Sequence, residues 1–236
     1  MSAQPAGAPV EIVIVDYGMG NRRSVEKALE HVGANTQITS DAGVIAKAAA
    51  LVLPGVGAFP RAIENLHRLG LAGTLRERVA AGVPMLGICL GMQLAFESST
   101  ELGGARGLGL VRGTVEQLRA DGLKLPHIGW NEVSLLRPDG HGAVAQLLNG
   151  LPERAAFYHV HSYAARPADP RAVIGTAHYG ETFATAVCSG SFYGVQFHPE
   201  KSSTAGLRVL ENFAAICATA AAAAPAQHAA RLGSAA

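Results

Sequence analysis

Three times within the first 96 residues, a short apolar run is followed by a turn and then by a segment with helical periodicity. The apolar runs cover residues 11–16, 51–53 and 83–89, and the predicted helices cover 22–31, 59–69 with a second at 71–81, and 90–96. Strands that alternate with helices in this way form a parallel sheet with right-handed crossover connections. We therefore expect an α/β fold with an open, largely parallel central sheet and flanking helices.

The second half of the chain predicts a different strand arrangement. Short β-like runs divided by glycine and proline cover residues 110–118, 127–133, 155–163, 173–179, 183–188 and 192–197. We expect them to form additional antiparallel strands, followed by a last helix from residue 204 into an alanine-rich segment. The whole is predicted to be a single domain over residues 10–224, with disordered tails at 1–9 and 225–236.

The composition indicates no nucleic acid, membrane or metal partner. Nineteen basic and 18 acidic residues leave a net charge of +1, and the three cysteines (Cys89, Cys188 and Cys217) contain no C-x-x-C pair. No secretory signal and no convincing bilayer-spanning run is visible. We expect a cytoplasmic protein without metal, cofactor or disulfide.

Cys89 lies at the carboxyl end of the third predicted strand, between Gly87 and Gly91. Flanking glycines allow a sharp strand-to-helix turn, as in the nucleophile elbow of serine hydrolases. The positive end of the following helix favours the reactive thiolate. Segments 16–18 and 54–57 also follow predicted strands, and sites in open α/β sheets form at that edge.

A second segment, His198-Pro199-Glu200, supplies a base and a carboxylate. Pro199 favours an extended conformation at His198, in which residues two apart point to the same side. Glu200 can then orient the imidazole while its other nitrogen faces Cys89. The two segments together predict a Cys–His–Glu catalytic triad.

With these segments in place, the chain resembles the class I (triad) glutamine amidotransferases over residues 10–218. The sequences GICLGMQ at 87–93 and QFHPE at 196–200 carry the general resemblance. The segments DYGMGN at 16–21, PGVGAF at 54–59, GWN at 129–131, HSY at 161–163 and KS at 201–202 make it most similar to the glutaminase subunits of imidazole glycerol phosphate synthases. The resemblance implies a flavodoxin-like fold.

The resemblance also implies a reaction. Cys89 attacks the side-chain amide of glutamine to form a γ-glutamyl thioester, His198 protonates the departing ammonia, and water then releases glutamate. The oxyanion requires backbone donors, and we expect them from Leu90 and from the loop Gly55, Val56 and Gly57. The candidates for binding glutamine are Gln93, His161, Ser162 and Tyr163.

In the resembling enzymes, ammonia passes to a (β/α)₈-barrel cyclase that forms imidazole glycerol phosphate and an aminoimidazole carboxamide ribotide. A chain of 236 residues cannot hold both that barrel and the triad domain, so a separate cyclase subunit in a heterodimer is implied. The candidates for the docking face and ammonia gate are Asn21, His127, Trp130 and Lys201. Arg22 departs from the apolar residue that the family usually has at this position.

Three alternatives remain open from the sequence. The chain could be an amidotransferase of another pathway, a stand-alone γ-glutamyl hydrolase, or a catalytically silent regulatory module on the same fold. The DYGMGN and PGVGAF segments argue against the first, and the intact Cys89, His198 and Glu200 argue against the third. Glutamate release without a partner would favour the second.

Overall fold

The parallel half of the sheet carries the candidate nucleophile. The computed structural model describes residues 10–136 and 146–233, with side chains up to residue 223. Five parallel strands lie in the order β2–β1–β3–β4–β13. They are β1 (Glu11–Val15), β2 (Asn35–Thr39), β3 (Leu51–Gly55), β4 (Met85–Cys89) and β13 (Phe192–Val195). The predicted parallel α/β sheet is confirmed.

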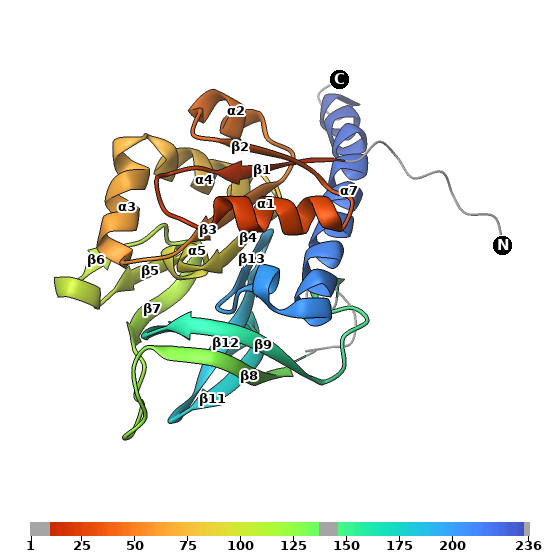
Figure 1. Ribbon diagram of the computed structural model, residues 1–236. Helices are drawn as coiled ribbons and strands as arrows, with labels where there is room; N and C mark the ends of the chain where they lie inside the picture. The colour runs from red at the N-terminus through yellow and green to blue at the C-terminus, as the bar shows by residue number, and fades with distance from the viewer. Residues whose placement is uncertain (1–9, 137–145, 234–236) are drawn as a thin grey trace.

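Helices cover both faces of this half (Figure 1). On one face lie α1 (Arg22–His31) and α7 (Ser203–Gly233), whose apolar residues, such as Leu29 and Phe213, share one core cluster. On the other face lie α2 (Ala42–Lys47), α3 (Phe59–Arg68) and α4 (Leu71–Ala80), with Ile45, Leu66 and Leu75 in a second cluster. The short helix α5 (Leu90–Leu94) follows β4 directly.

The other half of the sheet is mainly antiparallel, as predicted. From β13 the sheet continues through β12, β10, β7, β5 and β6, while β11 joins β12 to β8, and β8 pairs with β9. Only the β5–β7 pair in this half is parallel among the described strands. The strands are β5 (Phe96–Ser99), β6 (Ala105–Arg106), β7 (Val111–Gln117), β8 (His127–Leu135), β9 (Arg154–His161), β10 (Tyr163–Pro167), β11 (Val173–Tyr179) and β12 (Glu181–Ser189). Three short 3₁₀ turns complete the described elements: η1 (Glu101–Gly103), η2 (Pro170–Ala172) and η3 (Pro199–Lys201).

Several predicted boundaries are wrong. The helix predicted over 90–96 ends at Leu94, because Phe96 begins β5, and the strand predicted over 155–163 is two strands divided at Ser162. The strands β2 and β5 and the helix α2 were not predicted. The last helix continues through Pro225 to Gly233, where a tail was predicted, because the alanines around the proline have high helix propensity. The tail predicted at 1–9 and the last three residues of the tail predicted at 225–236 lie outside the described residues.

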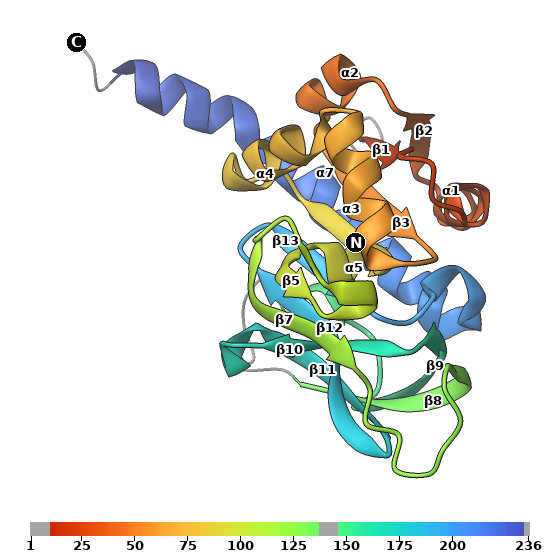
Figure 2. The same cartoon turned by 90° about the vertical axis from the view of Figure 1, so that its left-hand side faces the viewer.

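The described part of α7, Ser203–Ala223, is long and apolar enough to cross a membrane by length and composition alone. Its buried residues recur at helical spacing: Gly206, Val209, Leu210, Phe213, Ile216 and Cys217. This periodicity is typical of a helix that packs one face against a protein core. Figure 2 shows the start of α7 against the sheet and its far end extending away from the body.

Candidate active site

Cys89 occupies a strained corner between β4 and α5. Its φ of 53° and ψ of −108° are unusual for a residue with a side chain. The flanking glycines do not themselves adopt positive φ; they allow close packing instead. A Cβ on Gly91 would overlap the carbonyl group of Leu53, and one on Gly87 would lie 2.7 Å from the carbonyl oxygen of Gly91. The glycines therefore bring α5 against β3 and leave Cys89 to make the turn.

His198 and Glu200 form a buried pair at the start of η3. Nδ1 of His198 lies 2.9 Å from Oε1 of Glu200, and Asn21 donates a hydrogen bond from Nδ2 to the same oxygen over 2.8 Å. The backbone N–H of His198 donates to the carbonyl of Tyr158 on β9, which fixes the segment to the sheet. The predicted pairing of His198 with Glu200 is thus present in the structure.

The sulfur of Cys89 has three polar neighbours. The imidazole of His198 lies close enough to interact with it, the amide Nε2 of Gln196 lies 3.6 Å away, and the carbonyl oxygen of Val160 lies 3.8 Å away. Because Nδ1 of His198 is engaged by Glu200, Nε2 is the ring nitrogen available to the thiol. The structure therefore brings together Cys89, His198 and Glu200 from three separate segments.

The protonation states of His198 and Glu200 are set by competing effects. Burial disfavours the imidazolium, but hydrogen bonds and charge interactions with Cys89 and Glu200 outweigh it and raise the pKa of His198 to about 10. Burial also opposes ionisation of Glu200, yet its hydrogen bond to His198 holds the carboxyl pKa below its usual value. His198 therefore carries a proton at neutral pH and can deliver it to a leaving group.

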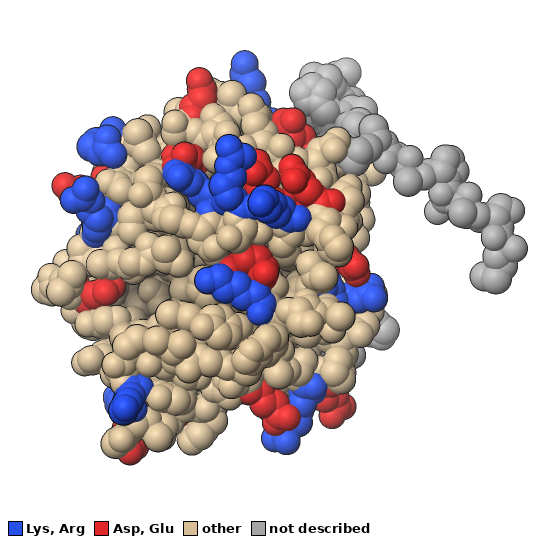
Figure 3. All heavy atoms as spheres, viewed as in Figure 1, with Lys and Arg blue, Asp and Glu red and all other residues tan. Residues whose placement is uncertain are grey.

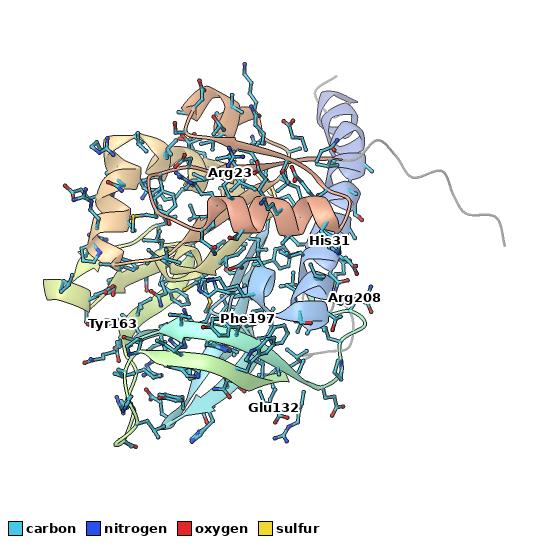
Figure 4. The ribbon with its side chains drawn as sticks, in the orientation of Figure 1. Arg23, His31, Glu132, Tyr163, Phe197 and Arg208 are labelled. Carbon is cyan, nitrogen blue, oxygen red and sulfur yellow. The ribbon has the colours of Figure 1, made fainter. Side chains whose placement is uncertain are left out.

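A cavity of about 240 Å³ opens above the sulfur. It is lined by residues of the predicted site and by three further residues, Glu101, Pro126 and Val160. The predicted residues that line it are Val56, Gly57, Cys89, Leu90, Gln93, His161, Ser162, Tyr163, His198 and Lys201. Gly55 does not line it but pairs with Cys89 across the β3–β4 register. In Figure 4, Tyr163 marks the start of β10, and the buried Phe197, next to His198, lies inside the fold.

Internal hydrogen bonds limit how two predicted binding residues can meet a ligand. Nε2 of Gln93 donates to the carbonyl of Tyr163 and to Oε1 of Gln196, both over 3.0 Å. Only the Oε1 acceptor of Gln93 remains for a ligand. His161 donates from Nδ1 to the carbonyl of Tyr163 over 2.9 Å, and its Nε2 lies 3.2 Å from Nδ1 of His127. His161 can therefore offer a ligand its ring edge and backbone but no ring nitrogen.

These bonds run in one direction through a buried histidine cluster. Since His161 donates to a carbonyl, its Nε2 must accept from His127, and Nε2 of His127 accepts from Asn131 over 3.4 Å. Burial lowers the pKa of His127, and it lowers that of His161 to about 3, so both rings stay neutral. His127 is only 3% exposed and stacks on Tyr179, so its side chain forms no docking surface.

The other residues predicted for the docking face differ in exposure. Trp130 on β8 is 56% exposed, and Lys201 is exposed and lines the cavity. Asn21 is half-buried and serves the triad through Glu200. Arg22 forms an ion pair with Asp16, which also accepts from the N–H of Gly18, so it braces the turn before α1.

Sequence reasoning missed Glu101, the one acidic residue that lines the cavity among the residues that the structure describes. Its Oε2 accepts the backbone N–H of Phe59 at the start of α3 over 2.8 Å, leaving Oε1 for a ligand. Gln196, whose amide contacts both Cys89 and Gln93, was quoted for family resemblance but not as a site residue. Its position two residues before His198, on the same side of an extended chain, was the available signal.

No cluster of three or more metal-ligating side chains occurs in residues 10–136 and 146–223. The three cysteines are unpaired and buried, and burial raises the pKa of Cys188 to about 11 and that of Cys217 to about 12. Those two thiols are therefore poor nucleophiles, and neither of them lines the cavity that Cys89 and His198 share.

Comparison with known proteins shows the family to which the chain is similar. The family described as glutamine amidotransferase class-I matches residues 13–217. The imidazole glycerol phosphate synthase subunit HisH of Moorella thermoacetica is 50% identical over 202 residues, covering 86% of this chain and 93% of that protein. The HisH subunits of Synechocystis and Pseudomonas putida are each 47% identical, covering 86% of this chain and 94% and 96% of their own lengths.

Solved structures share the fold at lower identity. The glutaminase domain of Trypanosoma brucei CTPS with bound acivicin has a TM-score of 0.62 and 19% identity, covering 90% of this chain and 94% of that one. A structure of PurLQS from Thermotoga maritima has a TM-score of 0.65 and 17% identity, covering 87% and 98%.

Proposed function

The chain belongs to the class I glutamine amidotransferase family, and we propose that it is the glutaminase subunit of an imidazole glycerol phosphate synthase. The observation that carries this function is the hydrogen-bonded pair His198–Glu200 beside Cys89, at a cavity of about 240 Å³ that Cys89 and His198 both line. The identity of about half the residues with HisH subunits supports this pathway over the alternative amidotransferases.

The chemistry follows from the triad. The thiolate sulfur of Cys89 bonds to the amide carbon of glutamine, and the carbon–nitrogen bond breaks as the leaving nitrogen takes the proton of the His198 imidazolium. Ammonia leaves and a γ-glutamyl thioester remains. Water then attacks the thioester while His198 accepts its proton; the carbon–sulfur bond breaks, glutamate is released, and the Cys89 thiolate and the His198 imidazolium are restored. Glu200 keeps the imidazole oriented and stabilises its charge throughout.

We assign the binding of the amino-acid end of glutamine to other residues that line the cavity beside Cys89. The free carboxylate oxygen of Glu101 suits the α-ammonium group, and Oε1 of Gln93 is a second acceptor. Ser162 and Tyr163 also line the cavity. The loop of Gly55, Val56 and Gly57, together with the N–H of Leu90, is the proposed oxyanion site, since all lie beside Cys89.

We propose that a (β/α)₈-barrel cyclase docks beside the cavity to form a heterodimer. Ile128 and Trp130 on β8 are 60% and 56% exposed, and they pair with Val160 and Tyr158 on β9. Val160 lines the catalytic cavity, so this apolar strip borders the site. Figure 3 shows charges of both signs interspersed over the helices and fewer over the part of the surface with β8 and β9. An uncharged, partly aromatic strip suits a protein partner. Lys201, at the same cavity, is the proposed gate residue.

The cytoplasm is the proposed compartment. The unpaired state of the three cysteines fits a reducing environment, and the proposed pathway enzyme acts on soluble metabolites.

The test is glutamate production from glutamine by the purified chain, alone and with a cyclase subunit and its ribonucleotide substrate. We expect strong stimulation by the partner. Cys89→Ala should abolish glutamine-dependent synthesis by the complex and leave ammonia-dependent synthesis intact, whereas Cys188→Ala should retain both. Equal turnover with and without the partner would indicate a free-standing hydrolase, and residual glutamine-dependent turnover in Cys89→Ala would place the nucleophile elsewhere.

A further inference from the structure

Tyr17 presents a buried hydroxyl that the mechanism does not yet use. Tyr17 lies two residues after the end of β1 and is fully buried. Its hydroxyl oxygen has no hydrogen-bond partner among the described residues. Burial strongly raises the pKa of Tyr17, so the hydroxyl keeps its proton and is a donor. An unpaired buried hydroxyl is costly and uncommon in folded proteins.

The hydroxyl lies against the first residue of the proposed oxyanion loop. A Cβ built on Gly55 would overlap this oxygen and would lie 3.4 Å from Cζ of Tyr17 and 3.3 Å from Cβ of Leu90. Gly55 ends β3 and pairs with Cys89, and Leu90 supplies the other proposed oxyanion donor. Tyr17 therefore reaches the junction of the two donor segments from the interior, although it does not line the cavity.

The peptide between Gly55 and Val56 links the Tyr17 hydroxyl to the proposed oxyanion site. In a trans peptide, the N–H of one residue and the carbonyl of the preceding residue point in opposite directions. When the N–H of Val56 points to an oxyanion above Cys89, the carbonyl of Gly55 must point away from the cavity, into the protein. A buried carbonyl on that side requires a donor, and Tyr17 holds an unused one next to Gly55.

We propose that Tyr17 is a positioning residue for the oxyanion site: its hydroxyl donates to the Gly55 carbonyl when the Gly55–Val56 peptide directs its N–H at the tetrahedral intermediate. This inference rests on the proposed glutaminase function. It also accounts for the lack of a side chain at Gly55, since any Cβ there would exclude the hydroxyl. The effect is confined to the state in which the oxyanion exists, so binding of glutamine itself does not require it.

The test compares Tyr17→Phe with the wild type in the complex with the cyclase subunit, and uses Tyr193→Phe as a matched control. Tyr193 is also a buried tyrosine, but it packs against Phe213 away from the cavity. The Phe substitution keeps the ring and removes only the hydroxyl. The net contribution of one neutral hydrogen bond corresponds to about a threefold to tenfold change. We expect the glutaminase kcat of Tyr17→Phe to fall by that factor with KM unchanged.

Two further measurements separate positioning from a general structural effect. Glutamate γ-semialdehyde adds to the thiol as a tetrahedral hemithioacetal, and its affinity should fall by the same factor as kcat. Alkylation of Cys89 by iodoacetamide, which forms no oxyanion, should keep its wild-type rate. Wild-type kcat and aldehyde affinity in Tyr17→Phe, or an equal loss in the alkylation rate, would overturn the inference. Absence of glutamate production by the wild-type complex would instead overturn the proposed function, and this inference with it.

Discussion

Replacing Gly91 by alanine should separate the role of close packing at the nucleophile corner from that of helix propensity. A Cβ on Gly91 would lie 2.8 Å from the carbonyl carbon of Leu53 and closer still to its oxygen, and both are backbone atoms of the central strand β3. A Cβ atom essentially never comes within 3.0 Å of a non-bonded heavy atom, so α5 must move away from β3. Overpacking of this kind typically costs about 1–3 kcal/mol of folding free energy.

The same displacement should reduce catalysis. Cys89 and Leu90 lie within two residues of Gly91, so the sulfur and the proposed oxyanion donor move with the helix. A misplacement of about 1 Å in a catalytic group can cost about a hundredfold in rate. We therefore expect Gly91→Ala to lower the free energy of unfolding by about 1–3 kcal/mol and to lower the glutaminase kcat by about a hundredfold.

Gly73 in α4 provides the matched control. It is also a helical glycine, but a Cβ there would meet no atom within 4 Å. Gly73→Ala should therefore stabilise the protein by about 0.5–1 kcal/mol and leave kcat unchanged. Urea unfolding and glutamate release in the cyclase complex measure both quantities. Wild-type stability and activity in Gly91→Ala would show that the corner does not depend on this close approach, and would refute the reasoning.

Three further predictions concern the groups around the triad. Asn21→Gly removes the amide that donates to Glu200 but keeps a residue suited to the φ of 79°, so the glutaminase kcat should fall about tenfold to a hundredfold, as for a hydrogen bond to a charged group. Arg22→Leu removes a partly exposed ion pair with Asp16, so the free energy of unfolding should change by less than about 1 kcal/mol and activity should persist. Burial opposes the charge of His198, but the interactions of the imidazole with Cys89 and Glu200 outweigh burial and raise the pKa of His198 from 6.5 to about 10. Protonation of His198 therefore stabilises the folded state fully below pH 6.5, and this stabilisation is lost as the pH rises to 10. The stability difference between wild type and His198→Gln should accordingly shrink as pH rises from 6.5 to 10 in urea titrations.

Each of these predictions has a contrary result. Unchanged kcat in Asn21→Gly would mean that Glu200 needs no second partner to orient His198. A large loss of stability in Arg22→Leu would assign the ion pair a role in the fold that its partial exposure does not suggest. A stability difference that grows with pH would reverse the sign argued for His198 and exclude a protonated imidazole at neutral pH.

The local parts of the fold and of the site could be predicted from the sequence. The helices α1, α3 and α4 and the strands β1, β3 and β4 have apolar patterns bounded by turns, and their signals lie within about one element's length of chain. Cys89 between two glycines and His198 before Pro199 are similarly local, and both are placed in the structure as the pattern indicates. The edge strand β2 was missed because its residues are polar and only partly buried, so it shows no apolar run.

Other features depend on contacts between distant segments. Leu94 ends α5 because Phe96 pairs with β7, a strand that begins 15 residues later, and no local propensity records that pairing. Glu101 belongs to the site because the chain returns past Phe59, 42 residues away in sequence. The histidine cluster fixes the roles of the His127 and His161 nitrogens through the pairing of β8 with β9, and this pairing buries a residue predicted to face a partner.

The sequence by itself determined the fold class, the family and the three candidate triad residues, because each is encoded in short segments whose periodicity and residue types act locally. Only the tertiary structure decided which polar atoms of those segments are hydrogen-bonded within the protein and which can bind a ligand. Hydrogen bonds and close packing join residues far apart in the chain, so the internal pairing of Gln93 and His161 and the unpaired hydroxyl of Tyr17 beside Gly55 exist only in the folded protein.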